Sequence, residues 1–177
     1  MCKNIFAIIG SASRHSANLQ LVNSIADLCA GEFSVNIFDR LSELPHFSPE
    51  LSIECTPEII VQFRQYIQDA DGVLICTPEY VFSIPSGLKN AIEWCVSTTV
   101  FSGKPTGLIT ASAHGVKAHE ELKLIMKTIE ASFIEGTTLL IQGIKGKIDK
   151  SGNLSNGKTR NDIQDFVVAF KGLIESA

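Results

Sequence analysis

The sequence predicts an α/β fold in which a five-stranded parallel sheet lies between two layers of helices. Short apolar segments alternate along the chain with longer segments in which apolar residues recur at helical spacing. The connections between these segments are short, which favours right-handed crossovers and therefore parallel strands. The apolar segments themselves are runs of the kind found in a sheet that is buried on both faces.

The expected strands are the five short apolar runs. They cover residues 4–9, 34–38, 72–77, 105–110 and 137–141. A helix is expected after the first strand, because apolar residues recur at helical spacing over residues 19–29 and Gly31 is placed to end it. A second helix is expected over residues 57–69, with Thr56 as its cap and Pro57 at its first position.

Three further helices are predicted from apolar residues at helical spacing. Their apolar positions are Leu88, Ala91, Ile92 and Cys95 in the third helix, Leu122, Ile125, Met126, Ile129 and Phe133 in the fourth, and Ile163, Phe166, Val167, Phe170 and Ile174 in the last. Five strands with such crossovers predict a flavodoxin-like three-layer sandwich with strand order 2-1-3-4-5. The 177 residues fit a single domain, 1–177, because domains typically contain about 100–200 residues.

Charge and composition exclude several classes of protein. The formal net charge is −4 and Lys and Arg do not cluster, which argues against a nucleic-acid partner. No apolar run approaches the roughly eighteen residues of a membrane span, and the N-terminus lacks signal-peptide features, so a cytoplasmic protein without a membrane partner is expected. The five cysteines form no C-x-x-C pair, so neither a disulfide framework nor a metal site is expected.

The first apolar run stops at a loop, residues 10–18, that carries Gly10, several hydroxyl groups and Arg14 before a helix begins. Backbone N–H groups, hydroxyl donors and a helix N-terminus at one point suit a phosphate group. The guanidinium of Arg14 can bind two phosphate oxygens at once. The loop is neither a Walker P-loop nor a dinucleotide fingerprint, because it lacks the Gly-Lys-Ser/Thr of the first and the additional glycines of the second.

The predicted strand order places a ligand crevice at the carboxyl ends of strands 1 and 3, where the chain reverses direction. The loop after strand 3, residues 77–85, contains two prolines, two aromatic residues and a carboxylate. Its prolines restrict the backbone, so the remaining N–H and C=O groups can be directed at a ligand. The loop after strand 4, residues 111–115, is small enough to approach the same ligand. These loops suit a phosphorylated planar heterocycle, for which flavin mononucleotide (FMN) is the candidate.

Two segments of the chain carry sequence signatures. The first is Gly10-Ser11-Ala12-Ser13-Arg14-His15-Ser16-Ala17-Asn18, and the second combines Pro78-Glu79-Tyr80, Ser83-Ile84-Pro85 and residues 88–94. Together they resemble the NAD(P)H-dependent FMN reductase family. The resemblance implies a flavodoxin-like homodimer or homotetramer with FMN as cofactor and NADPH or NADH as co-substrate. It also implies hydride transfer through FMN to a small-molecule acceptor, namely a quinone, an azo compound, a metal oxyanion or free flavin.

The resemblance further implies which residues bind the cofactor. They are Ser11, Ser13, Arg14, His15, Ser16 and Asn18 around the phosphate, Pro78, Glu79, Tyr80, Val81 and Ser83 beside the isoalloxazine ring, and Ser112, His114 and Gly115 on its other side. The family often has its arginine three residues after the glycine, a position that Ser13 holds here, so either Ser13 or Arg14 meets the phosphate. No protein acid, base or nucleophile is required, because the flavin accepts the hydride.

Several of these residues, and the function itself, also allow a second interpretation. Ser16 is also placed to cap the first helix. Leu88, Ile92, Trp94 and Phe101 suit either core packing or a subunit contact. A non-enzymatic FMN-binding electron carrier or redox-sensing module is the rival function, since one fold hosts many activities. The balanced charge of the chain favours the enzyme, because electron-carrier flavodoxins are usually far more acidic.

Overall fold

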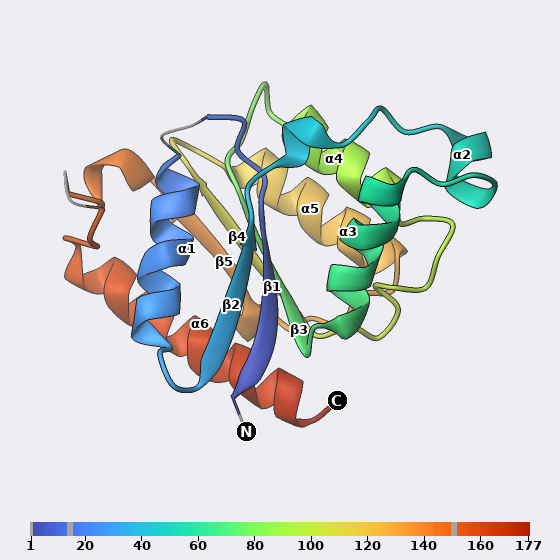
Figure 1. The fold of residues 1–177 in the computed structure, drawn as a ribbon. Helices are drawn as coiled ribbons and strands as arrows, with labels where there is room; N and C mark the ends of the chain where they lie inside the picture. Colours follow the sequence, from blue (N-terminus) through green and yellow to red (C-terminus); the bar gives the residue numbers. More distant parts are fainter. Residues whose placement is uncertain (1, 14–15, 150–151) are drawn as a thin grey trace.

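The computed structural model describes residues 2–13, 16–149 and 152–177. Five parallel strands form one sheet in the order β2-β1-β3-β4-β5, as Figure 1 shows. The strands are β1 (Lys3–Ile9), β2 (Phe33–Phe38), β3 (Gly72–Thr77), β4 (Thr106–Ser112) and β5 (Thr138–Gln142). The predicted fold class and strand order are therefore confirmed.

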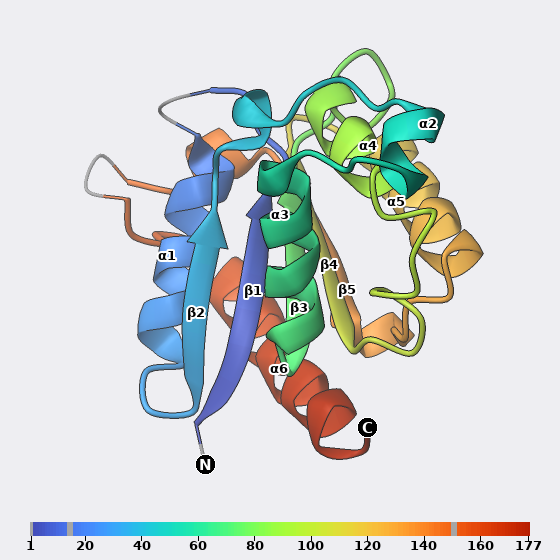
Figure 2. The same cartoon turned by 45° about the vertical axis from the view of Figure 1, so that its right-hand side comes forward.

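The longer helices lie in two layers, one on each face of the sheet (Figures 1 and 2). One layer consists of α1 (Ala17–Leu28) and α6 (Gly157–Glu175), and the other of α3 (Glu58–Asp69), α4 (Ser86–Glu93) and α5 (Val116–Thr128). Short elements complete the fold, namely α2 (Pro49–Ile53) and the 3-10 turns η1 (Leu41–Glu43), η2 (Glu135–Thr137) and η3 (Ile144–Gly146). Within the described residues, no helix has the length and apolar character to cross a membrane.

The side chains of the central strands alternate between the two layers. Phe6 and Ile8 of β1 pack into the core beneath α3, α4 and α5. Ile5, Ala7 and Ile9 of the same strand pack into the core beneath α1 and α6. β3 is likewise buried along its whole length. Burial on both faces explains why these strands are near-continuous apolar runs in the sequence.

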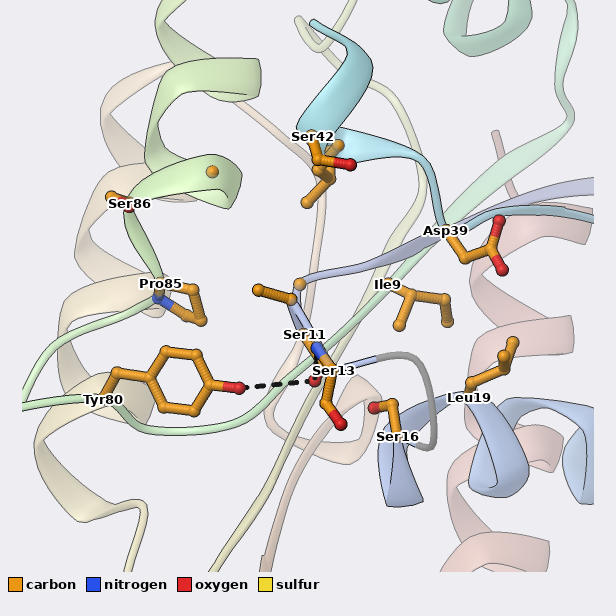
Figure 3. A pocket seen from close by; sticks show the side chains of 14 residues that line it. Ile9, Ser11, Ser13, Ser16, Leu19, Asp39, Ser42, Tyr80, Pro85 and Ser86 are labelled. Atoms are coloured by element: carbon orange, nitrogen blue, oxygen red, sulfur yellow. Dashed lines mark hydrogen bonds between the residues drawn. The ribbon is translucent and has the colours of Figure 1, made fainter.

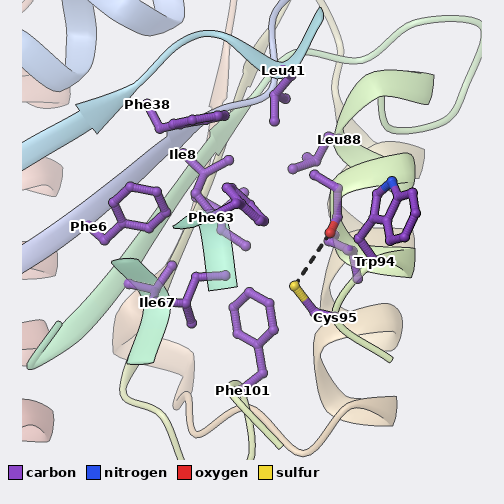
Figure 4. Close-up of a cluster of buried hydrophobic side chains, with 14 of the residues drawn as sticks. Phe6, Ile8, Phe38, Leu41, Phe63, Ile67, Leu88, Trp94, Cys95 and Phe101 are labelled. Carbon is purple, nitrogen blue, oxygen red and sulfur yellow. Dashed lines mark hydrogen bonds between the residues drawn. The ribbon is translucent and has the colours of Figure 1, made fainter. Parts of the chain in front are cut away.

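The core beneath α3, α4 and α5 is rich in aromatic side chains (Figure 4). Phe63 packs against Phe6 and Phe38, with ring centroids 5.8 and 5.1 Å apart. Trp94 is fully buried, and its indole Nε1 donates a 2.8 Å hydrogen bond to the carbonyl oxygen of Pro45. The four residues that suited either core packing or a subunit contact are all buried within the chain, which assigns them to the core: Leu88, Ile92, Trp94 and Phe101.

The start of α3 differs from the prediction. Pro57 has φ −55° and ψ 140°, so it is the capping residue, and the helix begins at Glu58. Thr56 does not cap the helix, because its hydroxyl donates to the carbonyl oxygen of Ser52 at 3.4 Å instead. The extended ψ of Pro57 is the physical reason for the shift, since a residue inside the helix needs a negative ψ.

The ends of α5 and β4 also differ from the prediction. α5 ends at Thr128, and Glu130 has a φ of 63° that a right-handed helix cannot continue through. Phe133 therefore lies beyond the helix to which its spacing assigned it. β4 continues to Ser112, past the predicted end at residue 110, because its last residues still pair with β5.

Candidate functional site

The carboxyl ends of the strands surround a cleft with two adjoining cavities. The central cavity, of about 490 Å³, is lined by Ser11, Ser13 and residues 16–18 at the start of α1, and by residues 78–80, 111–113 and 143–146. The side cavity, of about 500 Å³, lies between the end of β2 and the start of α4 (Figure 3). The wall between the two cavities is shared by Ser11, Ser13, Ser16 and Tyr80. A cleft thus lies where the strand order predicts a ligand crevice.

Hydroxyl groups converge at the N-terminus of α1. Ser16 caps the helix, because its Oγ accepts a 3.2 Å hydrogen bond from the backbone N–H of Asn18. Ser11 Oγ accepts a 3.2 Å hydrogen bond from the N–H of Ser13 and lies 3.4 Å from the hydroxyl oxygen of Tyr80. The first turn of α1 carries no acidic side chain. A helix N-terminus flanked by hydroxyl groups and free of carboxylates favours an anionic ligand group.

The side chain of Asn18 fixes this helix end over the sheet. Asn18 is buried, and its Nδ2 donates a 3.2 Å hydrogen bond to the carbonyl oxygen of Ala111 in β4. Its Oδ1 accepts a 3.2 Å hydrogen bond from the thiol of Cys76 in β3. Burial raises the pKa of the Cys76 thiol, so this sulfur remains a protonated donor. Asn18 therefore holds the start of α1 at the ends of β3 and β4.

Glu79 joins the loop after β3 to the start of α5. Its carboxylate accepts hydrogen bonds from the backbone N–H groups of Gly115, Lys117 and Ala118, at 3.2, 3.0 and 3.1 Å. These bonds, the one from Ala118 above all, hold the pKa of Glu79 below its usual range. The carboxylate supplies the cap that Gly115, the capping residue of α5, cannot provide from a side chain.

Glu121 of α5 holds the other end of the same loop. Its Oε2 accepts a 2.7 Å hydrogen bond from the hydroxyl of Ser83 and a 2.8 Å hydrogen bond from the backbone N–H of Ile84. The loop after β3 is thus attached to α5 at two points, through Glu79 and through Glu121. This double attachment makes the loop a rigid wall of the cleft.

The tip of the loop is a tight turn formed by Val81 and Phe82. Tyr80 and Ser83 exchange two backbone hydrogen bonds of 2.9 and 3.1 Å across it. Val81 and Phe82 have φ values of 52° and 60°, in the left-handed region that branched and bulky residues rarely occupy. These two residues are 95 % and 75 % exposed. Such strain is concentrated in proteins at ligand-binding and switching segments.

Replacing Glu79 with alanine should destabilise the fold by about 1 kcal/mol at neutral pH, the usual effect of losing a helix cap. Folding lowers the pKa of Glu79. Its contribution to the free energy of unfolding is therefore fully present above its ordinary pKa of 4.5, and is lost as the pH falls through its lowered pKa in the folded protein. Urea-induced unfolding of both proteins over this pH range measures the difference. Glu120→Ala, at an exposed position of α5, is the control that should change little. If the difference in the free energy of unfolding between the wild type and Glu79→Ala persists unchanged at acidic pH, the capping role is contradicted.

The structure brings eight of the predicted site residues together at the central cavity. They are Ser11, Ser13, Ser16, Asn18, Pro78, Glu79, Tyr80 and Ser112. Four other predicted residues are absent from its described lining. Val81 and His114 are exposed to solvent. Ser83 donates to Glu121, and Gly115 caps α5. Arg14 and His15 lie outside the described residues.

Sequence reasoning missed two parts of the cleft. The segment after β5, with Gly143, Ile144, Lys145 and Gly146, lines the central cavity and contributes a basic side chain. Asp39, Leu41 and Ser42, which follow β2, line the side cavity. Both follow a parallel strand at the edge of the sheet where ligands bind, and that topological position is the signal that predicts them.

The residues present fit a phosphorylated planar heterocycle such as FMN. The central cavity is lined by serine hydroxyls and the N-terminus of α1, which suit a phosphate. Pro78, Tyr80 and the backbone of residues 111–113 also line this cavity, and they suit a flat ring with polar edges. The volume of about 490 Å³ lies within the range of cofactor pockets.

Comparison with known proteins agrees with this fit. Residues 3–145 match the family described as NADPH-dependent FMN reductase. The chain is 32% identical to a 2-hydroxy-1,4-benzoquinone reductase of a Burkholderia species, over 94% of this chain and 93% of that protein. It is 28% identical to a quinone reductase of Pseudomonas putida, over 97% of this chain and 95% of that protein.

A solved structure supports the same assignment. The fold is similar to that of a flavoenzyme NAD(P)H:(acceptor) oxidoreductase from Paracoccus denitrificans, with a TM-score of 0.82, 26% identity and 98% of each chain covered. The family match spans most of the chain, and the relatives are matched along nearly their whole length. These matches confirm the predicted enzyme class and FMN as cofactor with NAD(P)H as co-substrate, and they establish that the chain belongs to the NADPH-dependent FMN reductase family.

Proposed function

We propose that this FMN-dependent NAD(P)H oxidoreductase passes its electrons to quinones. The Burkholderia and Pseudomonas relatives are both named as reductases of quinones and are matched along more than nine tenths of their length. The observation that carries the proposal is the central cavity, which places the hydroxyl groups at the N-terminus of α1 beside a rigid aromatic loop. Azo compounds, metal oxyanions and free flavin are the other acceptors that the family implies.

We assign FMN to the central cavity. Its phosphate is bound by Ser11, Ser16, the N-terminus of α1 and either Ser13 or Arg14, and its ring is bordered by Pro78, Tyr80 and Ser112. Lys145 adds a positive charge on the wall that follows β5. Val81, Ser83, His114 and Gly115 remain predicted contacts that the described lining of the cavity does not include. His15, which lies outside the described residues, also remains a predicted contact. The placement is supported by the hydroxyl groups and the planar side chain of Tyr80, which line the same cavity.

The protein contributes binding and orientation. When bound, FMN supplies the centre that accepts hydride and returns electrons to the acceptor. The backbone N–H groups of Glu79 and Val81 make no hydrogen bond within the described residues, so they can donate to the polar edge of the ring. The attachment of their loop to Glu121 keeps these donors in place, and donors fixed in advance stabilise charge better than mobile ones do.

The exposed tip of this loop supports a homodimer or homotetramer. Val81 and Phe82 expose apolar side chains on a strained turn at the edge of the central cavity. Covering such exposed apolar side chains with the surface of a second subunit removes them from water and stabilises the assembly. Sedimentation velocity of the flavin-loaded protein measures the assembly directly, and a monomer at all concentrations contradicts it.

The cytoplasm is the compartment that we propose. All five cysteines are free thiols, two of them exposed. Exposed thiols persist in reducing compartments, whereas oxidising compartments favour disulfides.

An anaerobic titration followed by a panel of acceptors tests the proposed function. The purified, FMN-loaded protein should lose its flavin colour on addition of NADH or NADPH and regain it on addition of a quinone. Steady-state rates with quinones, azo dyes, metal oxyanions and free flavin then rank the acceptors, and quinones should give the highest kcat/KM. A flavin that neither pyridine nucleotide bleaches contradicts the proposal and favours an electron carrier instead.

A further inference from the structure

We propose that the side cavity binds the adenosine half of the nicotinamide nucleotide, and that Asp39 makes the enzyme prefer NADH to NADPH. This inference rests on the proposed function, because it requires that the nicotinamide reacts at the central cavity. It concerns a different cavity and a residue that no flavin contact involves.

The two cavities are adjacent. Ser11 and Tyr80 belong to both linings, and in Figure 3 Tyr80 lies at one end of the side cavity whereas Asp39 lies at the other. A molecule whose reactive end lies beside Tyr80 can therefore extend along the side cavity towards Asp39. A pyridine dinucleotide has this shape, with its nicotinamide at one end and its adenosine at the other.

Asp39 is placed to accept hydrogen bonds from the ribose of the adenosine. It follows the last residue of β2, its side chain is exposed at the rim of the cavity, and it makes no hydrogen bond or ion pair within the described residues. A carboxylate accepts hydrogen bonds from the two hydroxyls of a ribose, and the same charge repels a 2′-phosphate. Asp39 therefore favours NADH by attraction and disfavours NADPH by repulsion.

The neighbouring cation does not offset this charge. Arg40 directs its guanidinium over the ring of Phe38, 5.4 Å from its centroid, and pairs with Glu43 at 3.3 Å. Among the described residues that line the side cavity, none is a lysine or an arginine. A 2′-phosphate needs a cationic partner to replace its hydration, and the only charged side chain in the described lining is the carboxylate of Asp39.

The remaining lining suits a nucleoside. Ile9, Leu19 and Leu41 supply apolar walls, and Ser42 and Ser86 supply hydroxyl groups. A pocket of this kind, mostly apolar with a few polar groups, is typical of sites for flat heterocycles. Its volume of about 500 Å³ accommodates one nucleoside beside the central cavity.

Kinetics with the flavin-loaded enzyme test the inference. The wild type should show a kcat/KM for NADH that exceeds the value for NADPH by about tenfold or more, the scale of one hydrogen bond to a charged group. Asp39→Ser should bring this ratio close to one, mainly through the KM for each nucleotide. Asp27→Ser, at an exposed aspartate near the far end of α1, is the matched control and should leave the ratio unchanged.

Binding to the flavin-loaded protein gives a readout that is independent of turnover. Calorimetry should show that the wild type binds 5′-AMP more tightly than adenosine 2′,5′-bisphosphate, and that Asp39→Ser reverses or abolishes the difference. An equal or greater kcat/KM for NADPH in the wild type overturns the inference, as does an unchanged ratio in Asp39→Ser. Failure of both nucleotides to reduce the flavin instead overturns the proposed function, so the two failures are distinguishable.

Discussion

Replacing Gly10 with alanine is expected to destabilise the fold by about 1–3 kcal/mol and to weaken FMN binding roughly tenfold or more. A Cβ atom at this position would overlap Oγ1 of Thr77, and it would lie 2.7 Å from Cβ of Thr77 and 3.0 Å from Cδ2 of Leu88. Thr77 and Leu88 are fully buried, so neither can give way. The end of β1 must therefore move, and with it the serines that line the central cavity.

Two measurements separate the effects on stability and on binding. Urea-induced unfolding of the flavin-free protein gives the free energy of unfolding, and fluorescence titration with FMN gives the dissociation constant. Gly172→Ala in α6 is the control, because a Cβ atom there meets nothing within 4 Å and alanine favours a helix. A Gly10→Ala protein that binds FMN as the wild type does contradicts the role of this close approach.

The second large effect is expected from Arg14→Ala. Loss of the guanidinium should weaken FMN binding by about 1.5–3 kcal/mol, the range for a hydrogen bond to a charged group. Riboflavin, which lacks the phosphate, should bind the variant and the wild type equally. Calorimetry with both ligands measures the difference between the two free energies of binding.

Two further variants decide which side chain meets the phosphate. Arg40→Ala removes an exposed arginine that pairs with Glu43, and it should leave FMN binding unchanged. Ser13→Ala tests the alternative contact. If Arg14→Ala has no effect and Ser13→Ala weakens binding, the phosphate contact belongs to Ser13, and the assignment to Arg14 is wrong.

Strands were more predictable from the sequence than helix ends. β3 spans Gly72–Thr77, the predicted bounds, because burial on both faces requires an unbroken apolar run. The end of α5 depends instead on the left-handed Glu130, which no spacing rule indicates. The cap of α3 depends on the extended ψ of Pro57. Helix ends follow from local backbone geometry, which apolar periodicity does not encode.

The sequence predicted the location of the site better than it predicted the contacts of its side chains. The loops after β1 and β3 meet because strand order alone brings their ends together. The direction of the Glu79 and Ser83 side chains depends on α5, which packs beside their loop although it is distant in sequence. Lys145 and Asp39 reach the cleft through the same tertiary arrangement. Such contacts require the folded structure, since no local pattern marks them.

A crystal structure of the protein with FMN is the most direct test of the account. The phosphate should lie at the N-terminus of α1 against Ser11 and Ser16, with the isoalloxazine ring between Tyr80 and Ser112. A central cavity that stays empty in saturating FMN, or a flavin bound elsewhere on the protein, contradicts the central claim.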